Sequence, residues 1–176
     1  ELGQAQISGV PKRVVVFDYG LLDIVDAVGG NIVGVVKDNL PQSLKKFSDK
    51  KYTNIGTLFE PNYETLIKLK PDLILISGRQ EKVYKELNKI APTIYLTVDG
   101  PTYMNDLKKN ARLIGDIFDK KSANLSLNSK YEQLTTLVTQ RSSGLENKIT
   151  ELEKELVKQE NEQRINVKML EHAYSM

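Results

Sequence analysis

The loop at residues 77–80, Ser-Gly-Arg-Gln, combines residue types that can bind an anion. The guanidinium of Arg79 carries five N–H donors in a fixed fork, which suits a delocalised negative charge. Gly78 before it allows the chain to turn sharply. Arg79 could instead pair with a carboxylate such as Glu81 or Asp99, or simply face water, and the spacing alone leaves these alternatives open.

Catalytic groups are scarce in the rest of the sequence. It contains no cysteine and one histidine, His172, which lies in the C-terminal tail far from this loop. It has neither a phosphate-binding glycine pattern nor a Gly-x-Ser-x-Gly nucleophile elbow. Asp18 lacks the acidic neighbours of a phosphoacceptor site, so we expect it to be a turn or cap residue. We therefore expect neither an enzyme nor a metal site made of protein ligands.

Composition excludes several other classes of protein. The 176 residues are 40% hydrophobic and 27% charged, with a formal net charge of +2. That apolar fraction supports a folded core and argues against disorder. The small net charge, without a basic run, predicts no nucleic-acid partner. No apolar stretch reaches the roughly 18 residues that a membrane span needs. The sequence begins at Glu1 without a charged segment followed by an apolar one, so we expect no signal peptide in it.

Five short apolar runs predict strands that are covered on both faces, as in a parallel sheet. These runs occupy residues 13–18, 31–36, 52–56, 72–77 and 93–98. Helical periodicity fills the gaps between them, so we predict an α/β fold with a five-stranded, mainly parallel, doubly wound lobe. Such sheets bind ligands beyond the carboxyl ends of their strands, where Arg79, Lys37 and Tyr19 would share one rim.

The C-terminal part of the sequence predicts a long helix. Residues 122–141 have a weak helical pattern, and Ser142, Ser143 and Gly144 suggest a break before the pattern sharpens. Beyond that point Leu145, Ile149, Leu152 and Leu156 are spaced by four, three and four residues, which is a heptad seam. Such a helix needs a partner, and it could either pack back on the lobe or pair with a second copy of the chain.

Several segments, in their order and spacing, resemble the iron–siderophore-binding proteins of ABC importers. They are PKRVVVFDYGLLD at 11–23, NIG at 54–56, EPNYE at 60–64, LKPDLILISGRQ at 69–80 and IAPT at 90–93. The likeness is greatest to the catecholate-siderophore branch. It covers about residues 1–120, the amino-terminal lobe of that family.

The resemblance implies a ligand, a partner and a location. Family members hold a ferric siderophore between two α/β lobes of the periplasmic-binding-protein type, and the siderophore itself ligates the iron, so no cofactor is expected. The family's ligand-binding arginine falls on Arg79. Its permease-docking glutamate falls on Glu64, although an acidic residue at a helix start has a simpler explanation in the helix dipole. The family works outside the cytoplasm, in the periplasm or as a membrane-anchored lipoprotein. Further ligand-binding residues expected in equivalent loops are Tyr19, Lys37, Asn39, Thr57 and Gln80.

The predicted domain plan departs from that family. We expect a siderophore-binding lobe at 1–120, a remnant of the family's spine helix at 121–142 and a coiled-coil tail at 143–176. No second α/β lobe follows, so the chain is interpreted as a truncated or chimeric half-receptor whose ligand affinity is impaired unless a second copy supplies the missing wall. The alternative is a structural or interaction protein, in which the lobe is a scaffold and the helix mediates assembly.

Overall fold

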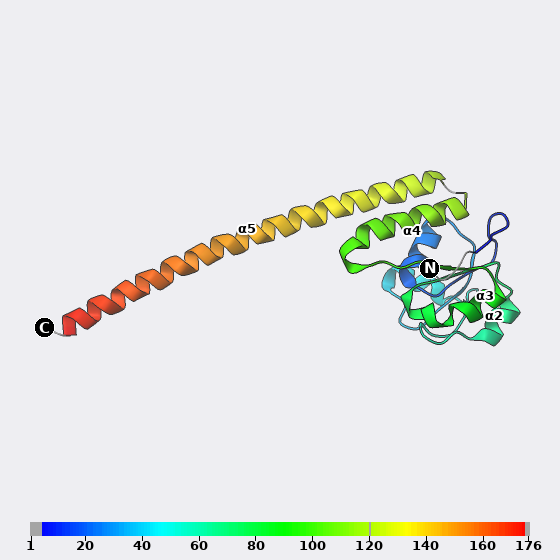
Figure 1. Cartoon of the computed structure of the whole chain (residues 1–176), viewed down its shortest axis with the longest axis horizontal. Helices are drawn as coiled ribbons and strands as arrows, with labels where there is room; N and C mark the ends of the chain where they lie inside the picture. The colour runs from blue at the N-terminus through cyan, green and yellow to red at the C-terminus, as the bar shows by residue number, and fades with distance from the viewer. Residues whose placement is uncertain (1–4, 120, 175–176) are drawn as a thin grey trace. The chain divides into compact units, whose positions relative to one another are not determined.

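The computed structural model describes residues 5–119 and 121–174, and their side chains over 5–119 and 129–164. The chain divides into two compact units, Glu1–Tyr131 and Glu132–Met176. The first unit contains a sheet with helices on both faces, and the second is part of one long helix (Figure 1).

The sheet has five parallel strands in the order β3-β2-β1-β4-β5. The strands are β1 (Val14–Val16), β2 (Ile32–Val35), β3 (Thr53–Asn54), β4 (Leu73–Ile76) and β5 (Thr93–Tyr95). Each falls inside one of the predicted apolar runs. The order places β1 and β4 side by side at the centre, so the chain winds outward from β1 in two directions. The predicted doubly wound α/β fold is therefore confirmed.

Helices follow the strands as the periodicity predicts. They are α1 (Tyr19–Ala27), α2 (Tyr63–Leu69), α3 (Tyr84–Ile90) and α4 (Tyr103–Ile117), with short 3-10 helices η1 (Gln42–Ser48), η2 (Gly78–Val83) and η3 (Gly100–Thr102). Asp18 caps α1 by accepting hydrogen bonds from the backbone N–H groups of Gly20 and Leu21, as expected for a cap residue. The loop that carries Arg79 is the 3-10 helix η2.

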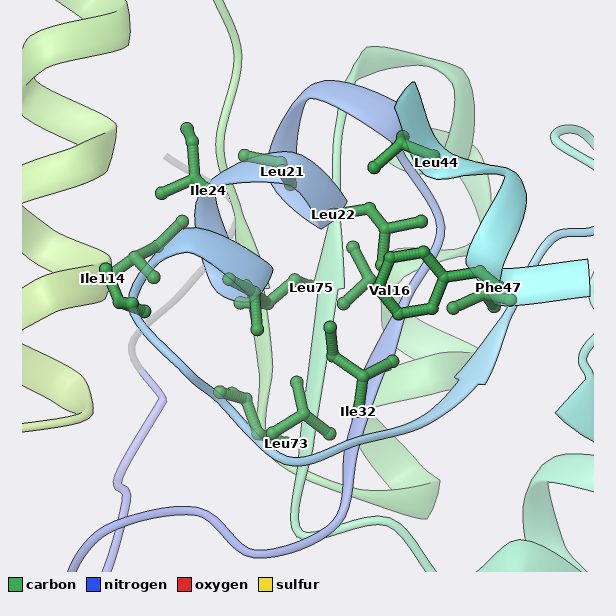
Figure 2. Close-up of a cluster of buried hydrophobic side chains, with 14 of the residues drawn as sticks. Val16, Leu21, Leu22, Ile24, Ile32, Leu44, Phe47, Leu73, Leu75 and Ile114 are labelled. Atoms are coloured by element: carbon green, nitrogen blue, oxygen red, sulfur yellow. The ribbon is translucent and has the colours of Figure 1, made fainter. Parts of the chain in front are cut away.

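One face of the sheet packs against α1, α4 and η1 (Figure 2). Val16 and Leu75, on neighbouring strands, point toward this face and contact the cluster that includes Leu22 of α1, Phe47 of η1 and Ile114 of α4. All five side chains are 2% exposed or less. Burial of this kind contributes about 1.5–3 kcal/mol for each large apolar side chain. The buried side chains of α1 therefore hold this helix, and the Asp18 cap at its start, against this face of the sheet.

The opposite face packs against α2 and α3, which lie next to each other on one side of the lobe (Figure 1). Val15 and Ile74 point this way and meet Leu66 of α2 and Leu87 of α3, all fully buried. Because successive strand residues point to opposite faces, both faces need apolar side chains. That requirement explains the unbroken apolar runs in the sequence.

The long helix α5 (Lys121–Tyr174) spans 54 residues without interruption. The predicted break at residues 142–144 is therefore wrong. Gly144 is not among the glycines with positive φ, so it adopts ordinary helical geometry, and one glycine in a helix costs only about 1 kcal/mol. The hydroxyl of Ser143 donates a hydrogen bond to the Thr139 carbonyl at 3.1 Å, within the helix. Of the helices in the described residues, none is both long enough and apolar enough to span a membrane.

Candidate functional site

A basin opens beyond the carboxyl ends of β1, β4 and β5. β1 and β4 are neighbours in the sheet. After β1 the chain continues to β2 on one side of this pair, and after β4 it continues to β5 on the other side. Such a switch point leaves a crevice in which open α/β sheets bind ligands. The volume of the basin is about 780 Å³, within the range of about 300–1,000 Å³ usual for small-molecule sites.

Arg79 lies on the wall of this basin, as the sequence predicts. Its Nη1 atom is 3.6 Å from Oδ2 of Asp18, and the arginine side chain is 51% exposed. The partner is thus neither Glu81 nor Asp99, the two carboxylates that the sequence suggested. A half-exposed ion pair of this length is worth at most about 1 kcal/mol, so an incoming anion can compete for the guanidinium.

Asp18 is held in place by other contacts. Its Oδ1 atom accepts the α1 cap hydrogen bonds at 2.9 and 3.1 Å, and its Oδ2 atom accepts one from the Ser77 hydroxyl at 2.9 Å. This carboxylate therefore links the end of β1 to the end of β4 and orients Arg79 from behind. It also partly neutralises the arginine, which limits how strongly the free basin attracts anions.

Aromatic residues form a second wall that the sequence analysis missed. Tyr95 at the end of β5 and Tyr103 at the start of α4 both line the basin, and Tyr103 is 50% exposed. The Tyr95 hydroxyl donates a hydrogen bond to Oε2 of Glu81 at 3.1 Å. Burial raises the pKa of Tyr95, and the bond to Glu81 raises it further, so the phenol stays neutral. Tyr95 lies within the fifth apolar run, and an aromatic residue in a run that leads to the expected ligand edge was the available signal.

Polar contacts fix the loop that carries this wall. The carboxylate of Asp106 accepts hydrogen bonds from the Asp99 backbone N–H at 3.2 Å and from the Thr102 hydroxyl at 2.7 Å. The Thr102 bond, followed by the Asp99 bond, lowers the pKa of Asp106 below its usual value. The buried Asn110 donates its amide hydrogen to the Thr97 carbonyl at 3.0 Å. The basin is therefore largely formed by the fold itself.

Tyr19 and Lys37, which were expected to share a rim with Arg79, are not among the residues that line the basin, and both use their polar atoms within the chain. The Tyr19 hydroxyl donates to the Asp38 carbonyl, and its pKa is raised by burial and by the charge of Asp38. Lys37 Nζ donates to two carbonyls at the end of η1, those of Ser48 at 3.2 Å and Asp49 at 2.8 Å. These contacts give both residues a structural role in holding the loop after β2.

Gln80, Thr57 and Asn39 also have local roles. Gln80 is fully buried, accepts from the Ser77 backbone N–H at 3.1 Å and donates to the Leu58 carbonyl. It joins the loops after β4 and β3 and offers no group to the basin in this conformation. The Thr57 hydroxyl accepts from two backbone N–H groups in its own turn. Asn39 is exposed and has a left-handed φ of 54°. Among the six residues predicted for the ligand, all of them in the described region, Arg79 alone lines the basin.

Glu64 lies on a different surface, in the first turn of α2. Its Oε1 atom is 2.6 Å from Nζ of Lys68, and the glutamate side chain is 79% exposed. Beside it, Tyr63 and Ile67 line a groove of about 570 Å³ between α2 and α3. The glutamate therefore stands at the edge of a partly apolar surface.

Where the structure describes the chain, no three His, Asp or Glu side chains gather in a way that could hold a metal ion. The side chain of His172 lies outside the described residues.

Comparison with known proteins assigns the family. The sequence matches the periplasmic binding protein family over residues 14–155. It is 51% identical over 113 residues to the petrobactin-binding protein YclQ of Bacillus subtilis. This alignment covers 63% of the present chain and 36% of YclQ. The sequence is 31% identical over 150 residues to the ferric-anguibactin-binding protein FatB of Vibrio anguillarum, which covers 80% of this chain and 47% of that protein.

A solved structure agrees with these matches. The siderophore-binding protein BauB, bound to ferric iron and two acinetobactin molecules, superposes with a TM-score of 0.75 at 31% identity, over 78% of this chain and 50% of BauB. The chain thus spans between about a third and a half of the length of these three relatives. With its doubly wound lobe and its match over residues 14–155, the chain belongs to the periplasmic binding protein family.

Proposed function

We propose that the lobe binds a ferric siderophore, an anionic catecholate-type chelate, for uptake by an ABC importer. The observation that carries this proposal is Arg79, a half-exposed guanidinium on the wall of an open basin at the sheet's switch point. The relatives named above, petrobactin- and ferric-anguibactin-binding proteins, support the ligand class. In this proposal the chelate supplies all of the iron ligands, and the protein acts as a binding protein outside the cytoplasm.

The two walls of the basin suit the two properties of such a chelate. Arg79 offers N–H donors to its negative charge, and charge-assisted hydrogen bonds are the stronger kind. Tyr95 and Tyr103 offer aromatic faces to its rings. Asp18 orients the guanidinium but competes with the ligand, so the arginine must exchange one carboxylate for another anion on binding.

Titration with the iron(III) complex of 2,3-dihydroxybenzoate tests the proposal. The chain has eight tyrosines and no tryptophan, so quenching of tyrosine fluorescence reports binding. We expect saturable quenching in the parent chain and an affinity roughly tenfold weaker in Arg79→Ala, which corresponds to about 1.4 kcal/mol. Arg79→Lys should lose less, because it keeps the charge without the fork.

Lys82→Ala is the matched control. Lys82 is an exposed cation in the same 3-10 helix, and it is absent from the described lining of the basin. Its removal subtracts the same charge without touching the site. Equal loss of affinity in Lys82→Ala and Arg79→Ala would mean that binding depends on the net charge of the lobe and not on Arg79 itself. A parent chain without saturable quenching would refute the proposal.

A permease is the second proposed partner, and Glu64 is its proposed contact. The support is the 79% exposure of the side chain at the edge of the α2–α3 groove. The Lys68 pair is a surface pair between neighbouring helix turns, worth about 0.3–0.5 kcal/mol, so a basic pocket on the permease can displace it. The negative charge of Glu64 also stabilises the N-terminus of α2. If this were the only role of Glu64, its substitution would leave docking unchanged.

Docking can be measured with a ferric-siderophore ABC permease in lipid nanodiscs. We expect Glu64→Lys to weaken binding of the liganded chain roughly tenfold, about 1.4 kcal/mol, while the ligand titration is unchanged. Asp116→Lys, the same charge reversal at an exposed position of α4, is the control. Unchanged docking in Glu64→Lys would assign the glutamate to its helix alone.

The alternative function, assembly through α5, is favoured by one observation. Large apolar side chains of this helix are more than half exposed at Leu145, Ile149, Leu152 and Leu156. A second copy of the chain is therefore a further proposed partner, and it does not exclude ligand binding by the lobe.

A further inference from the structure

The four apolar side chains of α5 form one continuous seam. Leu145, Ile149, Leu152 and Leu156 are 63%, 55%, 54% and 57% exposed. Their spacing of four, three and four residues places them on the same side of the helix, as in the a and d positions of a heptad. Ile149 and Leu156 take the a positions, and Leu145 and Leu152 take the d positions. A stripe this regular and this exposed indicates a surface that another helix covers.

Residue types along the seam favour two strands. Leucine occupies both d positions, Leu145 and Leu152, and one of the two a positions holds the β-branched Ile149; β-branched residues at a with leucine at d favour parallel dimers. Beyond Leu156 the next two seam positions are Gln159 and Gln163. The apolar seam therefore ends at Leu156, and on its other side the preceding a position is the polar Ser142.

Charges beside the seam specify a second copy as the occupant. In a parallel, in-register pair, each g residue faces the e residue five positions later on the other helix. Arg141 then faces Glu146 of the second copy, and Lys148 faces Glu153 of the second copy. Two-fold symmetry repeats both contacts, so four oppositely charged pairs flank the apolar seam. All four residues are exposed.

Within residues 141–156 the same charges favour the reverse orientation less. In an antiparallel pair e residues face e residues and g residues face g residues. Glu146 then repels Glu153 of the other copy while Lys148 attracts Glu155, so the charged contacts offset one another. Charges also limit the length of the parallel pair. The next g residue, Glu155, would face the e residue Glu160 of the second copy, and these two like charges repel. This repulsion begins where the seam becomes polar, at Gln159. The apolar pattern and the charge pattern thus end together.

We propose that residues 141–156 of α5 pair with the same residues of a second copy as a short, parallel, two-stranded coiled coil. Because the apolar contact spans so few turns, the association is weak and depends on concentration. Because exposed ion pairs flank it, high salt weakens it further. The pairing depends on the helix alone and stands or falls independently of ligand binding by the lobe.

Sedimentation equilibrium of the full chain, from low to high micromolar concentration, tests the pairing. We expect a reversible monomer–dimer equilibrium that Leu152→Asp weakens at least tenfold. Val157→Asp is the control, because Val157 is equally exposed, at 56%, but lies outside the seam. Circular dichroism shows whether each variant keeps its helix. A parent chain that is monomeric throughout, or equal weakening in both variants, overturns the proposal.

A charge reversal tests the orientation separately. In the parallel pair Glu153→Lys faces Lys148 and weakens the dimer, whereas in an antiparallel pair it would face Glu146 and strengthen it. We expect weakening by Glu153→Lys and recovery in the double variant Lys148→Glu/Glu153→Lys. A tighter dimer in Glu153→Lys overturns the parallel arrangement, even if Leu152→Asp behaves as expected.

Discussion

Leucines in the two units of the chain have opposite surroundings. Leu75, at the centre of the sheet, is fully buried, whereas Leu152 in α5 is 54% exposed. Both belong to regular apolar patterns. In the lobe the chain itself supplies the covering helices, so the pattern is satisfied within one copy. The exposed seam of α5 instead carries charges that match a second copy. An apolar pattern alone therefore predicts that a surface is covered, and the flanking charges indicate by what.

One substitution made in both places tests this comparison most strongly. Leu75→Ala should destabilise the lobe by about 2–5 kcal/mol, because it removes buried methyl groups and leaves a cavity. Leu152→Ala should change the free energy of unfolding of the lobe by no more than about 0.5 kcal/mol. Urea titration at low protein concentration, followed by tyrosine fluorescence, measures both values.

The comparison would fail if Leu152→Ala cost the lobe as much as Leu75→Ala. That result would mean that the seam contributes to lobe stability within a single copy. Loss of dimer without loss of lobe stability in Leu152→Ala would sharpen the comparison, since the two units would then differ in what their leucines stabilise.

Most of the fold could be predicted because its signals are local. A strand covered on both faces needs an unbroken apolar run, and each of the five runs became a parallel strand. The break predicted at Gly144 failed because glycine only permits a left-handed turn and does not impose one. Without another segment to hold such a turn, the helix continues through the glycine.

The candidate site was harder to predict because its walls come from distant parts of the sequence. Arg79 could be found because it directly follows the strongest strand. Gln80 is its neighbour, yet its side chain turns inward to join two loops, and no sequence pattern distinguishes these two directions. Tyr103 lines the same basin as Arg79 only because β5 and α4 bring it there. Such contacts depend on tertiary packing, which residue spacing does not report.

Two glycines provide a smaller test of the same comparison. Gly56, after β3, has φ of +111°, and an added Cβ would lie 2.3 Å from the Glu60 carbonyl oxygen. Gly56→Ala should therefore destabilise the lobe by about 1–3 kcal/mol through backbone strain, with displacement of the Thr57 turn in addition. In α5 an added Cβ at Gly144 meets no atom within 4 Å. Gly144→Ala should stabilise the helix by up to about 1 kcal/mol, since alanine is the better helix former.

Far-UV circular dichroism during heating measures the effect on α5, and urea titration measures the effect on the lobe. Position 144 is a c position of the heptad, directly before the seam at Leu145, so the added methyl group leaves the proposed contact surface intact. Gly144→Ala should therefore strengthen the dimer slightly, because a helix that is already more ordered loses less conformational entropy when it pairs. If Gly144→Ala instead weakened the dimer, residue 144 would lie within the contact, and the heptad assignment of the seam would have to change.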